Sequence, residues 1–309
     1  MRALVAALGA SLAAVLAVVL VVTLVAPSRS VTGDASAEEV RGESRAASAT
    51  STGAITTETV ARQAGSLAGR IRAAGDGHII FRYDTWPDVT GDENGNLNRG
   101  NQFHGEFNFS SSRRGGDLRD HGEWTTGPMT AVLSLRQGLV TRMKIGIDET
   151  RWHDGDVAAD LGQVSTGEAA RYLLQLASTT TRDGLGEDAI VAAVFVRDGD
   201  VWDELFRIAR DTSRPDEVRS SALFWIGQEA GDRATPELVG VAEDEGDSDI
   251  RESAVFALSQ RPESEAIPSL TRLARTSRHA DVRKSALFWL AQHDDPKVID
   301  FFEELLAGD

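Results

Sequence analysis

The sequence predicts a mainly α-helical protein, in which a stack of helix pairs is preceded by a small antiparallel β-rich segment and an N-terminal hydrophobic helix. Three observations predict this fold class: an uncharged apolar run near the N-terminus, a middle region where apolar and polar residues alternate, and a C-terminal half that repeats itself every 32 residues. With 309 residues, of which 41% are hydrophobic, the chain is long enough to bury a sizeable core.

Composition excludes several classes of function. The formal net charge is −16, and a field of this sign repels phosphate backbones, so we expect no nucleic-acid partner. The chain has no cysteine, which excludes thiol nucleophiles, iron–sulfur clusters, cysteine zinc sites and disulfides. Composition indicates no cofactor and makes no prediction of the oligomeric state.

The N-terminal region 1–26 is a signal peptide or a membrane anchor helix. Residues 3–26 carry no charge and follow Arg2. Signal peptides have apolar regions of about 7 to 15 residues, whereas about 20 span a bilayer, so the length favours a retained anchor. The Ala-Ser-Ala sequence at 35–37 favours cleavage instead. Both alternatives place the rest outside the cytoplasm, in the cell envelope, either attached to the membrane through residues 3–26 or secreted after cleavage.

A linker and a short helix come next. Residues 27–57 have almost no large apolar side chain, which predicts a disordered linker. The region 58–157 is predicted to be a small α+β segment with antiparallel strands. It opens with an amphipathic helix, because Leu67 and Ile71 keep helical spacing behind a cap at Thr57.

Alternating segments predict the strands. Residues 79–83 and 103–109 place aromatic or aliphatic side chains at every second position. Residues 131–135 and 139–147 alternate too, and Gln137-Gly138 between them is typical of a hairpin turn. The segment after residue 151, with Trp152 and His153, is expected to leave the sheet as a linker.

Two His-x-Glu pairs in this segment favour an alternative chemistry. His104 and Glu106, and likewise His121 and Glu123, would share a strand face and so could hold a metal ion or act as acid and base. We favour a solvated face for these pairs, because such residues are ordinarily exposed. We therefore expect no metal site and no catalytic residue.

An asparagine-rich pattern resembles the start of a calcium loop. Asp92, Asn94, Asn96 and Asn98 alternate, but Leu97 stands where an EF-hand loop needs glycine. The sequence predicts a turn connection here.

The C-terminal region 158–309 is predicted to be an array of helical repeats. Three eight-residue segments start with Ser-Ala and end with Gln, 32 residues apart, and an acidic residue, an aliphatic residue and an arginine precede each. The three segments and their triplets are 221–228 after Glu217-Val218-Arg219, 253–260 after Asp249-Ile250-Arg251, and 285–292 after Asp281-Val282-Arg283.

A second helix per unit follows from the same period. Apolar residues recur at Leu174, Phe206, Leu238, Leu270 and Phe302. The array therefore begins near Thr166 and contains four helix pairs and a fifth first helix, 296–307. In that last helix we expect Phe302, Leu305 and Leu306 to face inward, as an end cap requires.

These repeats resemble the HEAT repeat family, whose paired helices stack into an α-solenoid and whose second helix opens like Asp281-Val282-Arg283. The leader, the strand-rich segment and the repeats together resemble exported bacterial proteins with HEAT repeats. The resemblance implies no catalytic residues. We expect Asp249 and Asp281 to cap their helices, and Arg251 or Arg283 to reach a carboxylate of the neighbouring unit.

We predict a non-enzymatic protein-binding or scaffold protein of the cell envelope, acting on a protein partner through the solenoid surface. An enzyme or metal-binding protein with its site in the strand-rich segment, and a structural envelope component without a discrete ligand, are the alternatives. The aromatic residues Phe224, Trp225, Phe256, Phe288 and Trp289 are expected in the core.

The predicted partner strip lies on the second helices, opposite the inward residues. Its positions vary between units, which indicates that packing does not constrain them. The strip comprises Asp216, Ser220, Gly227, Ser248, Glu252, Ser259, Lys284 and Ala291.

Overall fold

A computed structural model describes residues 65–91, 96–99, 109–110, 124–147, 157–182, 184–229 and 231–307, all within one compact unit, Ile55–Asp309. The predicted N-terminal helix, the linker 27–57 and both His-x-Glu pairs lie outside these residues. Among the described helices, none is long and apolar enough to cross a membrane.

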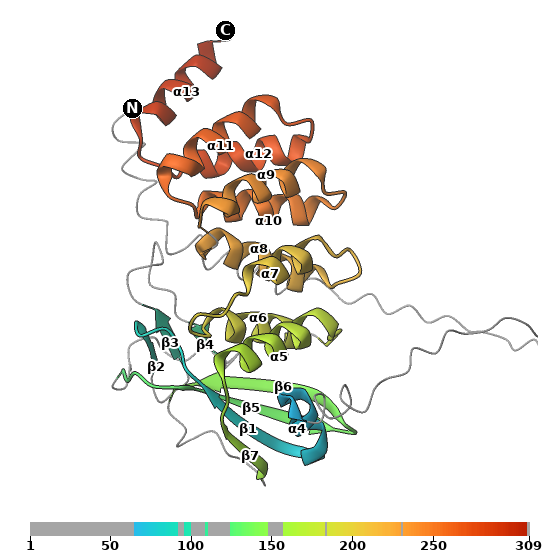
Figure 1. Ribbon diagram of the computed structural model, residues 1–309. Helices are drawn as coiled ribbons and strands as arrows, with labels where there is room; N and C mark the ends of the chain where they lie inside the picture. Colours follow the sequence, from blue (N-terminus) through green and yellow to red (C-terminus); the bar gives the residue numbers. More distant parts are fainter. Residues whose placement is uncertain are drawn as a thin grey trace, which may run out of the picture. The chain divides into compact units, whose positions relative to one another are not determined.

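The strands form two sheets (Figure 1). The larger has the order β6-β5-β1-β7, with antiparallel pairs except for the parallel pair β1 and β7. The smaller has the order β2-β3-β4. The bounds are β1 Gly77–Tyr83, β2 Val89–Gly91, β3 Asn96–Arg99, β4 Phe109–Ser110, β5 Met129–Arg136, β6 Leu139–Gly146 and β7 Val157–Gln163.

Helix pairs follow the large sheet, as predicted. The pairs are α5/α6, α7/α8, α9/α10 and α11/α12, and α13 stands after the last pair. The predicted start near Thr166 and the last helix 296–307 are confirmed. The bounds are α4 Leu67–Ala74, α5 Thr166–Thr179, α6 Leu185–Val194, α7 Trp202–Arg210, α8 Asp216–Glu229, α9 Ala234–Asp244, α10 Ser248–Ser259, α11 Glu263–Thr276, α12 Ala280–Leu290 and α13 Pro296–Ala307.

The predicted β5–β6 hairpin is confirmed. Gln137 and Gly138 at its turn have φ angles of 53° and 72°, a left-handed conformation that glycine adopts without strain. Asp76 accepts hydrogen bonds from both backbone N–H groups, at 2.7 and 2.8 Å. These bonds lower the pKa of the Asp76 carboxyl below its usual range.

Strand β7 was not predicted. It lies parallel to β1 at the edge of the sheet, and most of its side chains are exposed or half-buried. Val157, Ala159 and Leu161 do alternate in β7, but the run is short and none of these side chains is buried, so the sequence pattern is weak. Gly77 lets β1 and β7 approach closely, since a Cβ on Gly77 would lie 2.8 Å from the Ala158 Cβ.

The boundary predicted between residues 157 and 158 falls inside β7, and the sheet and the first helix pair share one core. Tyr83 on β1 donates its hydroxyl to the Ala192 carbonyl of α6 at 2.9 Å. Its complete burial raises its pKa. The Phe81 ring meets Tyr172 of α5 edge to face, with ring centroids 6.1 Å apart. The sheet therefore covers the first end of the array.

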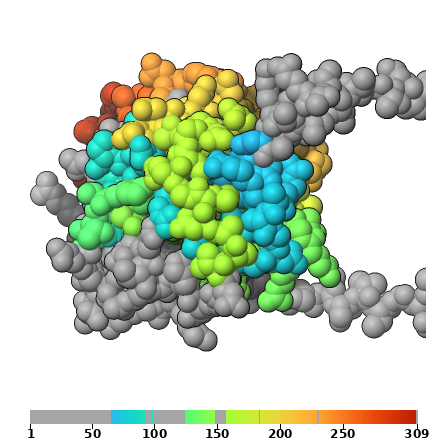
Figure 2. Space-filling view, turned by 60° about the horizontal axis from the view of Figure 1, so that its bottom comes forward, coloured from blue at the N-terminus to red at the C-terminus, as the bar shows by residue number. Residues whose placement is uncertain are grey.

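The described part of the predicted helix contains α4, and the predicted cap at Thr57 lies outside the described residues. Ser66 is the N-cap of α4, and the Ser66 hydroxyl accepts from the Gly69 N–H at 3.2 Å. Leu67 and Ile71 are buried, as their spacing predicted. Figure 2 shows α4, in blue, beside the chain that runs from β7 into α5.

The asparagine-rich pattern is part of a strand, not only a turn. Asn96 and Asn98 lie in β3, and Leu97 between them is fully buried. Leucine stands at the position where a calcium loop needs glycine because its side chain is part of the core.

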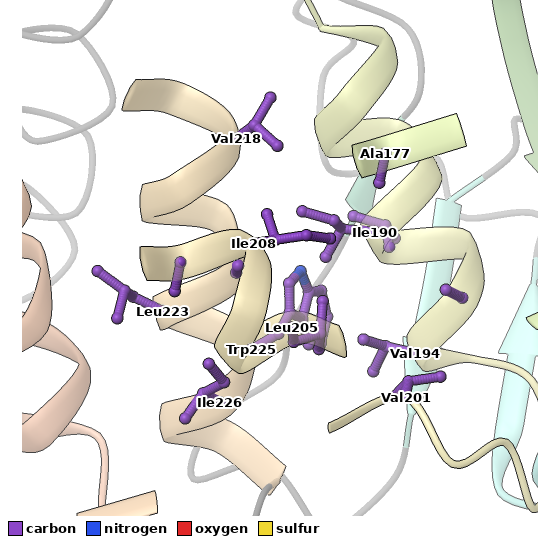
Figure 3. Packing of buried hydrophobic residues seen from close by; sticks show 14 of the residues in the cluster. Ala177, Ile190, Val194, Val201, Leu205, Ile208, Val218, Leu223, Trp225 and Ile226 are labelled. Atoms are coloured by element: carbon purple, nitrogen blue, oxygen red, sulfur yellow. The ribbon is translucent and has the colours of Figure 1, made fainter. Parts of the chain in front are cut away.

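Within the array, each helix buries the side chains that face its neighbours. Trp225 of α8 is fully buried, as predicted, and lies beside Leu205 with Ile190 nearby (Figure 3). Its indole meets the Phe195 ring edge to face at 5.9 Å. Leu223 points from the opposite side of the same helix toward the following unit (Figure 3). A second helix therefore packs on two sides.

Helix α13 does not close the array as predicted. Val298 and Phe301 are buried, but Leu305 is 51% exposed and Leu306 is 86% exposed. Within the described residues no helix follows α13 to cover these two leucines.

Candidate functional site

The second helices α8, α10 and α12 lie side by side, so that aromatic side chains of successive units meet. The rings of Phe224 and Phe256 stack with centroids 6.1 Å apart, and Phe256 meets Trp289 at 4.9 Å. Phe288 contacts Trp289 edge to face at 5.0 Å. We call these four residues the aromatic row.

Buried arginines join each unit to the next. Arg251 of α10 donates from Nε to Oδ2 of Asp281 in α12 at 2.8 Å, and this bond lowers the pKa of the Asp281 carboxyl. Arg219 of α8 pairs with Glu245, in the connection before α10. These contacts confirm the prediction that Arg251 reaches a carboxylate of the neighbouring unit.

The predicted roles of the acidic signature residues are wrong in part. The cap of α10 is Asp247, whose Oδ1 accepts from the N–H groups of Asp249 and Ile250 at 2.8 and 3.2 Å. No side chain caps α12, where Asp281 instead receives the arginine of the preceding unit. Asp249 and Asp281 lie inside the first turn of their helices, whereas the N-cap position is the residue before the helix.

The predicted partner strip divides into two groups. Five of its residues are exposed, whereas Ser220, Gly227 and Ser259 are not. The Ser220 hydroxyl lies 3.0 Å from the Ser253 hydroxyl of the next unit. The exposed residues are Asp216, Ser248, Glu252, Lys284 and Ala291.

Gly227 is a packing residue and not a surface residue. A Cβ placed on it would lie 2.6 Å from the Ala257 carbonyl oxygen of α10. Its own carbonyl accepts from Nη1 of Arg261 at 3.1 Å. Helix α10 covers the side of α8 that faces away from its own unit. The strip was predicted from the pattern within single helices, and part of it is therefore an interface between units.

The aromatic row was predicted to be core, and only part of that prediction is right. Trp225 is buried, but Phe224, Phe256 and Trp289 are half-buried and Phe288 is 47% exposed. Phenylalanine recurs every 32 residues on the second helices, and this recurrence was the sequence signal that could have predicted the aromatic row. The free flank of the second helices therefore carries aromatic rings.

Carboxylates lie beside this row. Glu217, Asp249 and Glu252 are exposed on α8 and α10. The pKa of Glu252 is raised, first by partial burial and then by its neighbours Asp249 and Asp281, whereas Lys284 and Arg251 act in the opposite direction. Two of the nearby arginines, Arg219 and Arg251, are buried in ion pairs. This flank thus combines ring surface with negative charge.

Two clefts lie between the first helices of successive units. A cleft of about 610 Å³ lies between α5 and α7 and is lined by Arg171, Asp198 and Glu204 among others. A smaller one of about 320 Å³ lies between α7 and α9. Among the described residues there is no group of three or more acidic or histidine side chains that could hold a metal ion.

Comparison with known proteins agrees with the helix pairs. A family model described as HEAT repeats matches residues 203–291, which span the pairs from α7 to α12. No curated protein matches the chain.

Proposed function

Residues 203–291 of this chain are HEAT repeats, and from this premise we propose that the protein is a non-enzymatic protein-binding or scaffold protein of the cell envelope. HEAT repeats are protein-interaction modules, because stacked units present an extended surface. The observation that carries the proposal is the aromatic row, which leaves three half-buried rings and one exposed ring on consecutive second helices.

The chemistry of the contact surface follows from its neighbours. Partly exposed aromatic rings offer apolar area with little loss of side-chain entropy. The exposed carboxylates Glu217, Asp249 and Glu252 beside them favour basic side chains on the partner. The partner we propose is therefore a protein segment with apolar and basic residues.

This proposal is tested by charge reversal on the surface. Glu217→Lys combined with Glu252→Lys should abolish capture of the partner by crosslinking in cells, because it replaces attraction with repulsion. The thermal unfolding midpoint should stay nearly unchanged, since both side chains are exposed.

A matched control reverses two exposed carboxylates outside the second helices, Asp200→Lys with Asp232→Lys. Capture should persist in this control. Capture that survives equally in both double variants would show that the second-helix flank does not bind the partner.

The location in the cell envelope is supported by the uncharged run of residues 3–26. A phosphatase fused after Thr57 should be active, because the enzyme matures outside the cytoplasm. An inactive fusion of normal abundance would contradict export. N-terminal sequencing of the mature protein then distinguishes an anchor from a cleaved signal peptide.

The non-enzymatic part of the proposal depends on the two His-x-Glu pairs. Metal analysis of the purified full chain should find no stoichiometric metal. A metal that is lost in the His104→Ala, His121→Ala double variant would favour a metal-binding protein instead.

A further inference from the structure

The last helix pair exposes residues that earlier pairs bury. Leu223 of α8 and Val255 of α10 are 1% and 0% exposed, whereas Leu287 at the same place on α12 is half-buried. Gly227 is buried and Ser259 half-buried, whereas Ala291 is exposed. One side of α12 is therefore uncovered.

Helix α13 shows the same difference from the first helices before it. Leu273 of α11 is fully buried, and Leu305, which is 32 residues later, is 51% exposed. Ala242 of α9 is fully buried and Ala274 of α11 is half-buried, whereas Leu306 at that place is 86% exposed. Leucines at positions of a packed stripe would ordinarily be covered.

In the earlier units the covering element is the second helix of the next unit. Helix α10 packs on α8 and on its own first helix α9, and α12 packs likewise on α10 and α11. The side of α8 that carries Leu223 faces the following unit (Figure 3). Helices α12 and α13 lie at one end of the array (Figure 1). We call these uncovered residues the end face, which comprises Arg283, Leu287 and Phe288 of α12, Ala291 at its C-cap, and Leu305 and Leu306 of α13.

The charges of the end face indicate the chemistry of what covers it. Arg219 pairs with Glu245 and Arg251 with Asp281, in each case a carboxylate at or before the start of the covering helix. Arg283 donates from Nη1 to the Ser277 carbonyl at 2.8 Å and has no carboxylate partner among the described residues. Next to it, Lys284 is exposed and adds positive charge.

We propose that the end face binds an amphipathic helix of a partner protein, in the position that the second helix of a fifth unit would occupy. The helix carries an acidic residue at its start, which pairs with Arg283, and a small residue where it crosses α12. Its apolar stripe packs on Leu287, Leu305 and Leu306. This end face shares Phe288 with the aromatic row but contains neither Glu217 nor Glu252, so its test does not depend on those two carboxylates.

A second copy of the chain is the less suitable occupant. Two copies meeting at their end faces would bring the exposed carboxylates Asp300 and Glu303 of both α13 helices into one contact. Like charges that approach across an interface oppose association.

The probe is a peptide that copies residues 279–293, since α12 covers the equivalent face of α10 and α11. A lactam between Lys284 and a glutamate introduced as Ala280→Glu holds it helical, because an isolated helix of this length is marginal in water. Both positions are exposed on α12. Labelled peptide should bind the full chain saturably, one peptide per chain, in fluorescence anisotropy.

Variants of the full chain locate the binding. Leu306→Glu should weaken it by at least about tenfold, because it places a charge in an apolar contact. Leu139→Glu is the matched control, since Leu139 is 60% exposed on β6, and should have no effect. Arg283→Ala in the chain and Asp281→Asn in the peptide should each weaken binding. When both changes are combined, the affinity should fall no further than with either change alone, because both remove the same ion pair.

Three results would overturn the proposal. The first is absence of saturable binding, and the second is equal affinity for the Leu306→Glu chain. The third is a concentration-dependent dimer in light scattering that Leu306→Glu abolishes, which would make a second copy the occupant. The Glu217→Lys, Glu252→Lys double variant should leave peptide affinity unchanged. The peptide experiment and the crosslinking experiment therefore test the end face and the proposed function independently.

Discussion

Gly227 decides how closely two neighbouring second helices approach. Its missing side chain leaves room for the backbone of α10 at Ala257, where any Cβ would clash. Glycine inside a helix ordinarily costs stability relative to alanine, so its presence here reflects the contact. The helix-interior position that looked variable from sequence is fixed by its neighbour.

Gly227→Val should destabilise the protein by about 1–3 kcal/mol, because the added atoms overlap the α10 backbone. The control is Gly240→Ala in α9, where a Cβ would meet only the Arg210 side chain at 3.9 Å. That change should be neutral or stabilising by up to about 1 kcal/mol. Urea unfolding measures both. Equal effects of the two variants would contradict the close approach.

The Arg251–Asp281 pair makes a pH prediction. Because the pKa of Asp281 is lowered in the folded state, its contribution is present above the unfolded value and is lost as the pH falls through the folded value. Asp281→Asn should therefore lower the free energy of unfolding by about 1–3 kcal/mol at neutral pH. The difference from the original protein should shrink in acid, below a pH of about 4. Unfolding curves at pH 7 and pH 3 check this, and a difference independent of pH would exclude the ion pair as its cause.

At the scale of elements, α8 shows that a helix in the array has a core side and a free flank. Trp225 and Phe224 are adjacent in sequence, yet one is fully buried and the other half-buried. Helix α11 contains Pro268 within its span. The position is exposed, so the ring meets solvent.

Trp225→Ala should lower the free energy of unfolding by about 3–5 kcal/mol, since it leaves a large cavity between α6 and α8. Phe288→Ala, which removes a ring that is 47% exposed, should cost clearly less. Thermal or urea unfolding compares the two. A cost for Phe288→Ala as large as that for Trp225→Ala would mean that the aromatic row is a core feature and not a surface.

At the scale of the whole molecule, the sheet is part of the array's stability. The contact between Tyr83 and Ala192 joins β1 to α6, and Arg197 pairs with Asp84 at 2.6 Å beside it. In a linear array each unit contacts only its neighbours, so a change at one end is felt mainly there. The sheet takes the place of a unit before α5/α6.

Tyr83→Phe removes the buried hydroxyl that donates to Ala192 and should cost about 1 kcal/mol. Amide hydrogen exchange should become faster in both β1 and α6, and should change little in α12. Faster exchange confined to β1 would show that the sheet and the array unfold independently.

The sequence by itself determined the helical array, its period and the bounds of its last helix. The β5–β6 hairpin was predicted as well, through Gln137-Gly138. Each of these features depends on a pattern within a short segment, because apolar spacing records which side of an element is buried. Of the candidate site, the sequence identified the second helices and Glu252, which lies beside the aromatic row, and four further residues of the predicted strip are exposed elsewhere on or directly after these helices.

The tertiary structure alone decided the rest, for one physical reason. Whether a residue is covered depends on the neighbour that packs on it, and no pattern within its own helix records that neighbour. Gly227 is buried because α10 approaches it, and β7 forms because β1 offers an edge. Leu306 is exposed because, in the described chain, nothing occupies the place that α12 fills over α10 and α11.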